Sequence, residues 1–130
     1  MQYQHLVHYT LAEARAALPE ITAILRRMKD LKHKLDLKGY NIRGHRYFGG
    51  MGTNGTKAYP DEMEELIQLY HQLTTKGIQL KDIDKGLIDF PSIRANGEEV
   101  YLCYMLGEPG IDYWHRIEDG YPGRQHVDSL

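Results

Sequence analysis

The sequence has one cysteine, no signal-like opening and no long apolar run, and each absence excludes a class of protein. The single cysteine, Cys103, cannot form an internal disulfide, and its apolar, strand-like surroundings favour core packing over a reactive thiol. No segment approaches the ~20 consecutive apolar residues of a membrane-spanning helix. We therefore predict a protein of the reducing cytoplasm that does not enter a membrane.

The sequence also lacks a strong net charge, because 16 basic side chains face 18 acidic ones, for a formal charge of -2. The two signs are unevenly distributed: residues 1–60 hold ten Lys/Arg and four Asp/Glu, whereas residues 82–130 hold four and ten. The balanced total argues against strong nonspecific DNA binding. Two solvated faces of opposite sign are the simplest interpretation, and a nucleic-acid or membrane patch on the basic half is the less favoured one.

The chain has 130 residues, close to the commonest domain size, and no stretch has the composition of a linker. We predict a single domain over residues 1–130, with a helical hairpin at about 11–76, a sheet at about 78–124 and a loose tail at 125–130. The expected fold class is α+β, an antiparallel two-helix hairpin packed on a small antiparallel sheet of three to four strands.

Local signals mark both ends of a first helix. Thr10 and Glu13 form the pattern of a capping box, in which each side chain satisfies a free backbone amide of the other residue. Apolar residues then recur at steps of three and four up to Leu35, and Gly39 ends the helix. Pro19 cannot donate an interior hydrogen bond, so either a short helix stops before it or one helix kinks there and continues.

A second helix is predicted to begin at Pro60-Asp61, where acidic side chains suit the positive end of the helix dipole, and to stop at Gly77. Its acidic charges complement the basic face of the first helix, which favours antiparallel packing. The connecting loop 39–59 is glycine-rich and long, and we interpret it as a mobile flap. Its G-x-G-x-x-G at residues 50–55 lacks the flanking strand and helix of a dinucleotide site.

The strongest strand signal is Asn96-Gly97 between two apolar runs, which predicts a hairpin with a two-residue type I′ turn. This register places Arg94 opposite Glu99, a favourable cross-strand pair. Both faces of the resulting sheet are mainly apolar. Because one helical hairpin can cover only one face, we expect a second copy of the chain to cover the other, as in a homodimer.

A second tight turn at residues 107–110 returns the chain and aligns polar side chains from three strands on one sheet face. These are Asp89, Tyr104, Tyr113 and His115, and the flanking turns bring Glu108 and Arg124 to the same rim. Asp89 and His115 lie two strands apart, roughly 10 Å at ~4.8 Å per strand, so a ligand or the tyrosines must bridge them. Three interpretations are open: a satisfied polar network at a buried interface, which we favour, a small-molecule pocket, and a catalytic or metal site.

The sequence identifies no cofactor and assigns no metal site. The residues that could bind a metal are His115, Glu108 and Asp89. Residues 3–9 read as a possible edge strand, in which His5 and His8 point to opposite faces and do not share an ion.

Several motifs together resemble the bacterial domain-of-unknown-function family 2203. The resemblance covers most of the chain and begins at Thr10-Leu11-Ala12-Glu13-Ala14 with Leu18-Pro19. It continues through Lys81-Asp82-Ile83-Asp84, Gly86-Leu87-Ile88-Asp89-Phe90-Pro91, Glu99-Val100-Tyr101-Leu102-Cys103, Leu106-Gly107-Glu108, Trp114-His115, and Gly120 with Arg124. Tyr104 stands where the family pattern has tryptophan, and this chain has a tail beyond Arg124. The resemblance implies a small bacterial cytoplasmic protein whose motif residues are Asp89, Glu108, His115 and Arg124, and it implies no reaction.

The leading hypothesis is a homodimeric binding or regulatory module with a polar site on one sheet face. The alternative is a small enzyme, with or without a metal, that uses Asp89, Glu108, His115 and Arg124. Nucleic-acid binding by the basic helix and loop is a third and less favoured hypothesis, which predicts an affinity that falls steeply with salt.

Overall fold

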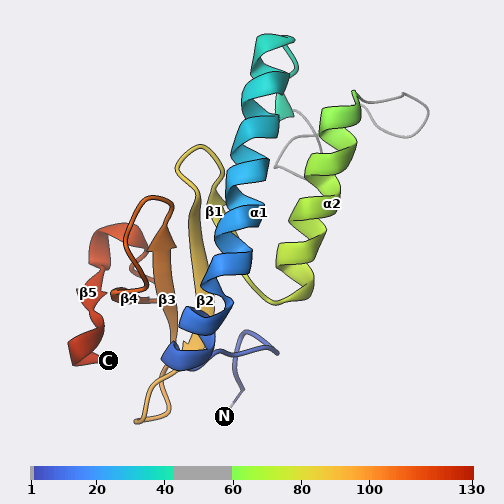
Figure 1. The fold of residues 1–130 in the computed structure, drawn as a ribbon. Coiled ribbons are helices and arrows are strands. Elements are labelled where there is room, and N and C mark those ends of the chain that lie inside the picture. Colours follow the sequence, from blue (N-terminus) through green and yellow to red (C-terminus); the bar gives the residue numbers. More distant parts are fainter. Residues whose placement is uncertain (1, 43–59) are drawn as a thin grey trace.

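The computed structural model describes residues 2–42 and 60–130. Two helices, α1 (Leu11–Leu37) and α2 (Asp61–Thr75), precede a five-stranded antiparallel sheet in the order β1-β2-β3-β4-β5 (Figure 1). The strands are β1 (Gln79–Asp82), β2 (Leu87–Ile93), β3 (Glu99–Met105), β4 (Tyr113–Arg116) and β5 (Gln125–His126), with short 3-10 helices η3 (Tyr121–Gly123) and η4 (Val127–Ser129). The fold is α+β as predicted, but the sheet has five strands instead of three to four.

The predicted capping signals are observed at both ends of α1. The Thr10 hydroxyl accepts a hydrogen bond from the Glu13 backbone N–H at 3.0 Å, and the Glu13 carboxylate accepts one from the Thr10 N–H at 2.8 Å. The helix continues through Pro19, which decides between the two alternatives left open by the sequence. Beyond its end, Gly39 takes a φ of 73°, the left-handed conformation that favours glycine at this position.

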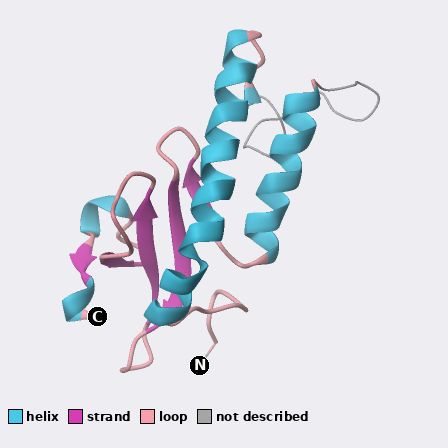
Figure 2. Ribbon diagram, in the orientation of Figure 1, coloured by secondary structure: helices cyan, strands magenta, loops and turns pink. Residues whose placement is uncertain are grey.

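The two helices lie side by side and run in opposite directions (Figures 1 and 2). Their complementary charges meet as expected: the Arg27 guanidinium binds both carboxylate oxygens of Glu65 at 2.7 Å, and Lys38 Nζ lies 2.8 Å from Glu62 Oε1. Among the described residues, no helix is both long enough and apolar enough to cross a membrane.

One face of the sheet, here called the inner face, packs against the helices. It contributes Ile88, Phe90, Val100, Leu102, Tyr104 and Trp114 to the same buried cluster as the apolar side chains of α1 and α2. Alternation along each strand sends the intervening side chains to the opposite, outer face. The candidate site described below lies on the outer face.

The β2–β3 hairpin has a register one residue away from the predicted one. Gly97 N–H donates to Arg94 O and Arg94 N–H donates to Glu98 O, so the loop has three residues, and Gly97 alone takes a positive φ of 89°. This is a type I turn closed by a glycine bulge, the other hairpin that Asn-Gly supports, and not the predicted type I′ turn. Consequently Ile93 faces Glu99, and Arg94 forms its ion pair with Glu98 at 2.9 Å.

Two terminal segments also differ from expectation. Residues 125–130 are not a loose tail, because β5 pairs with β4 and Trp114 Nε1 donates to Ser129 Oγ at 3.1 Å. Residues 2–9 contain no strand. They form an arm that is attached to the sheet by a hydrogen bond from Tyr9 N–H to Pro91 O at 2.8 Å. The predicted flap at 39–59, with its G-x-G-x-x-G, lies outside the described residues from 43 onward.

Candidate functional site

A buried ion pair occupies the outer face of the sheet. The register aligns Asp89 with Cys103 across β2 and β3, and Tyr101 with His115 across β3 and β4, so all four side chains share this face. The His115 imidazole crosses β3 diagonally, and its Nε2 lies 3.0 Å from Asp89 Oδ1. The expectations that Asp89 and His115 share a face and lie two strands apart are confirmed. The expectation that a ligand or the tyrosines must bridge them is wrong, because the imidazole reaches the carboxylate directly.

The proton positions of His115 follow from its two partners. Nδ1 lies 2.7 Å from the backbone carbonyl of Arg116, which can only accept, so Nδ1 carries a proton. Nε2 faces a carboxylate, so a further proton lies between Nε2 and Asp89. Burial opposes the charged imidazolium, but the hydrogen bonds to Asp89 and to the Arg116 carbonyl outweigh it and raise the pKa of His115. Both side chains of the pair are 2–3% exposed.

Cys103 completes the cluster from the centre of the sheet. Its side chain is fully buried, as predicted, but it lies on the outer face beside Asp89 and not with Trp114. Burial raises the pKa of the Cys103 thiol, and the negative charge of Asp89 raises it further. A thiol held in the protonated form is a poor nucleophile, so the site does not have the character of a cysteine hydrolase.

A small cavity of about 130 Å³ opens beside these side chains, and we call it the outer-face pocket. It is lined by Lys81, Leu87, Asp89, Tyr101, Cys103, His115, Ile117, Gly120 and Tyr121. The Lys81 ammonium lies 3.9 Å from Asp89 Oδ2 and 4.7 Å from the centre of the Tyr101 ring. The volume is equivalent to roughly four water molecules at ~30 Å³ each, so only a small ligand fits.

Glu108 and Arg124 form a separate pair near this face. The Arg124 guanidinium donates to both Glu108 oxygens at 2.8 Å and stacks on the Tyr113 ring, with its carbon 4.0 Å from the ring centre. Glu108 also accepts a hydrogen bond from the Met105 backbone N–H at 2.7 Å. The Glu108 carboxylate is therefore engaged with Arg124 and is not among the donor atoms that converge with Asp89 and His115.

The two candidate tyrosines have different positions. Tyr113 is on the outer face, aligned with Cys103, and is close to the Arg124 pair and not to the pocket. Tyr104 is on the inner face, aligned with Ile88, and donates its hydroxyl proton to Glu108 O at 3.1 Å. The prediction that Tyr104 shares a sheet face with Asp89 and His115 is wrong, because the one-residue change in register moves it to the other side of the sheet.

The N-terminal arm touches the same face from the side. His5 Nε2 is hydrogen-bonded to the Tyr101 hydroxyl at 2.7 Å, and His8 Nε2 lies 2.7 Å from Glu99 Oε2. Glu99 also accepts hydrogen bonds from the backbone N–H groups of Gln4 and His5. Burial opposes ionisation of Glu99, but the hydrogen bond to His8 and those from the arm backbone together lower its pKa.

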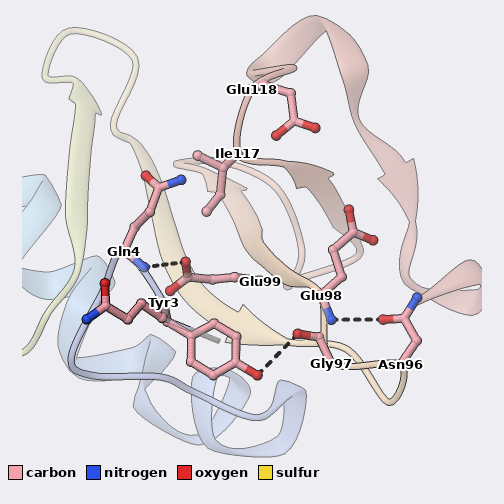
Figure 3. Close-up of a pocket in the computed structure, with 9 residues that line it drawn as sticks. Tyr3, Gln4, Asn96, Gly97, Glu98, Glu99, Ile117 and Glu118 are labelled. Carbon is pink, nitrogen blue, oxygen red and sulfur yellow. Dashed lines mark hydrogen bonds between the residues drawn. The ribbon is translucent and has the colours of Figure 1, made fainter.

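A larger hollow of about 510 Å³ lies between this arm and the hairpin tip (Figure 3). Two of its acidic side chains have partners: Glu99 is bound by the arm, and Glu98 pairs with Arg94 and Arg116. The Tyr3 hydroxyl donates to Gly97 O at 3.1 Å across the hollow, as Figure 3 shows. The hollow is thus held together by its own hydrogen bonds, and the buried donors converge in the smaller outer-face pocket.

Three donor atoms in the outer-face pocket have the types that transition metals prefer. One atom each from Asp89, Cys103 and His115 lies within 4.8 Å of the other two. Among the described residues, these side chains form the group of His, Cys, Asp and Glu donors that could hold a metal ion. Two of these residues, Asp89 and His115, were predicted from the sequence, whereas Cys103 was assigned to the core. Tyr101 and Lys81 were also missed, although Lys81-Asp82 and Tyr101 stand in the motifs that carried the family resemblance.

Comparison with protein families gives one match. The model of the family described as "Uncharacterized conserved protein (DUF2203)" matches residues 8–127. The chain belongs to the DUF2203 family. Comparisons with curated proteins and with solved structures found no significant match. The DUF2203 match includes every residue of the outer-face pocket and assigns no activity to it.

Proposed function

We propose that this DUF2203 protein is a homodimeric binding module whose ligand site is the outer-face pocket. One observation carries the proposal: the hydrogen-bonded pair of His115 and Asp89, 2–3% exposed, stands at the wall of a cavity and not in a sealed core. A ligand in this cavity reaches an imidazole, a carboxylate and the Lys81 ammonium together.

A purely structural role explains this pair less well. Burying two charges is costly, and apolar side chains of similar volume often give equal or greater stability. The inner face of the same sheet shows that alternative, since Phe90 and Trp114 fill it with apolar volume. Charged groups placed beside an open cavity are better explained by recognition of a small polar ligand.

The exposed apolar side chains support the homodimer. Three of the large ones, Tyr3, Ile93 and Tyr121, are about 40% exposed, and each is on or beside the outer face. Asp89 and His115 are already buried within one chain. A second copy is therefore not needed to cover the centre of the outer face. Support for the dimer therefore comes from the three exposed side chains at the rim of the outer face. The outer face of a second copy would cover them.

The metal-assisted enzyme is the second candidate. It is favoured by the convergence of an imidazole, a carboxylate and a thiol at a cavity with room for a further small molecule. Nucleic-acid binding has less support, because basic side chains such as Arg27 of α1 and Lys38 directly after it are already paired with acidic groups of α2.

Backbone amide NMR on the full chain tests the binding site. Probes are acetate, inorganic phosphate, methylammonium and zinc chloride, the first three with a chelator present. We expect at least one probe to shift the amides of Tyr101, Cys103 and His115, and to lose this effect in His115→Ala but not in the matched variant His33→Ala, whose histidine is exposed on α1. The small ions are added at tens of millimolar and zinc in molar excess. If none of the probes changes these amide signals, the result contradicts the proposal.

Sedimentation equilibrium tests the homodimer separately. We expect a mass of twice 15.1 kDa for the wild type and a weaker association for Ile93→Glu, which places a charge on the outer face rim. If the protein is a monomer that still binds a probe, the proposed homodimer is wrong and the proposed binding site stands.

A further inference from the structure

The donor set in the outer-face pocket is specific enough to identify the ligand by chemistry. Asp89 contributes a carboxylate oxygen, Cys103 a sulfur and His115 an imidazole nitrogen, each from a different central strand of the sheet. All three side chains are buried, and their donor atoms lie within 4.8 Å of one another. A rigid sheet holds such a set more precisely than loops do, because pairing fixes each strand relative to the next.

His115 is oriented as a metal-binding histidine would be. Its Nδ1–H donates to the Arg116 carbonyl at 2.7 Å, and this bond directs Nε2 toward Asp89 and the cavity. In metal sites the histidine that binds through one nitrogen commonly donates the other N–H to a carbonyl or carboxylate, which sets the tautomer and the ring orientation. The bond from Nδ1–H to the Arg116 carbonyl is a supporting bond of this kind.

Building on the proposed function, we propose that the ligand is a zinc ion held by Asp89, Cys103 and His115, with a fourth position that faces the outer-face pocket. Zinc accepts mixed oxygen, nitrogen and sulfur ligands in tetrahedral geometry, whereas magnesium and calcium prefer oxygen alone. Three protein ligands and an adjacent cavity are the arrangement of an open zinc site.

Zinc binding to this set releases protons. Metals bind the neutral imidazole nitrogen and the thiolate sulfur, so the Nε2 proton of His115 and the thiol proton of Cys103 pass to solvent as these two atoms coordinate the ion.

The geometry requires only small movements. Nε2 and Oδ1 are now joined by a 3.0 Å hydrogen bond, and ligand bonds of about 2.0–2.3 Å to a central ion need them slightly farther apart. The neighbouring cavity provides the space for this separation. The other described candidates are engaged elsewhere, since Glu108 is bound by Arg124 and His5 by the Tyr101 hydroxyl.

Metal titration of the chelator-treated full chain tests the inference. Zinc content is measured by elemental analysis after gel filtration, and cobalt(II) is added as a spectroscopic probe. We expect one zinc per chain, and with cobalt a tetrahedral spectrum that includes a thiolate-to-cobalt charge-transfer band. Cys103→Ser keeps the side-chain volume and should abolish that band, while His115→Ala and Asp89→Asn should weaken zinc binding at least about 100-fold.

Matched variants and the metal-free probes separate the outcomes. His33→Ala and Glu108→Gln should bind zinc like the wild type. Zinc binding that survives in both Cys103→Ser and His115→Ala, or no zinc at all, overturns the metal site. If acetate, phosphate or methylammonium then still shifts the His115 amide, the proposed binding module stands without a metal. Circular dichroism of each variant shows that a loss of zinc does not reflect loss of the fold.

Discussion

The buried pair of Asp89 and His115 leads to a quantitative prediction about folding stability. Asp89→Leu keeps the number of side-chain heavy atoms but leaves the imidazole without its acceptor. Both groups are 2–3% exposed and 3.0 Å apart, so the change removes a charge-assisted hydrogen bond inside the sheet. Breaking such a buried pair costs about 3–5 kcal/mol when the remaining partner stays charged. The cost is smaller when that partner, here the imidazole, can release its proton. We expect a loss of about 3 kcal/mol at pH 6.

The double variant Asp89→Leu/His115→Phe distinguishes an interacting pair from two independent residues. With both members of the pair removed, neither of them is left buried without the other, and the adjacent cavity of about 130 Å³ accepts the extra ring atom. We expect the double variant to lose no more than about 1 kcal/mol, because apolar replacement of a buried ion pair is often neutral.

Urea unfolding in the presence of a chelator measures these values, with fluorescence of the sole tryptophan, Trp114, as the signal. Asp128→Asn is the matched control, since its side chain is 91% exposed and substitutions at such sites change stability by at most about 0.5 kcal/mol. If the losses of Asp89→Leu and of His115→Phe alone simply add in the double variant, the two residues do not act as a pair. The same conclusion follows if Asp89→Leu unfolds like Asp128→Asn.

Three further predictions concern the scaffold. Gly97→Ala should cost about 1–2 kcal/mol in urea unfolding because φ is 89°, whereas Gly110→Ala, with open space and an ordinary φ, should cost little. Thr10→Ala should cost about 1 kcal/mol by loss of the N-cap, and an unchanged midpoint would contradict this. Since folding lowers the pKa of Glu99, its stabilisation is present above the ordinary glutamate range near pH 4.5 and is lost as pH falls through the lowered value. Glu99→Gln should therefore flatten the acid side of the stability profile, and an unaltered profile would count against the arm contacts.

Much of the fold could be predicted because its signals are local. The capping box at Thr10 and the glycines at positions 39 and 77 set helix ends within one or two residues of those observed. The complementary charges of α1 and α2 also gave a correct pairing. Such signals depend on neighbours in sequence, and tertiary packing does not override them here.

The errors came from a choice that local sequence does not decide. Asn96-Gly97 supports both a two-residue type I′ loop and a three-residue loop with a glycine bulge, and in both the glycine follows the asparagine. A difference of one residue reverses the faces of β3, since side chains alternate along a strand. That step moved Cys103 into the site and Tyr104 out of it. A second difference of one residue, between β3 and β4, aligns Tyr113 with Cys103 and not with Tyr104, and this keeps His115 on the face of Asp89.

The composition of the site was predictable in part for a related reason. Asp89 and His115 were placed on one face correctly, but strand spacing alone overestimated their separation because it ignores the length and direction of the imidazole. The short strand β5 was missed because two residues carry no periodic pattern, and its attachment depends on Trp114 and Ser129.

The most direct test of the outer-face pocket as a zinc site is anomalous diffraction from a crystal of the zinc-loaded protein. We predict one anomalous peak at about 2.0–2.3 Å from the Nε2 of His115, the Sγ of Cys103 and a carboxylate oxygen of Asp89. A peak on other residues, or no peak with the 3.0 Å hydrogen bond between His115 and Asp89 intact, would contradict it.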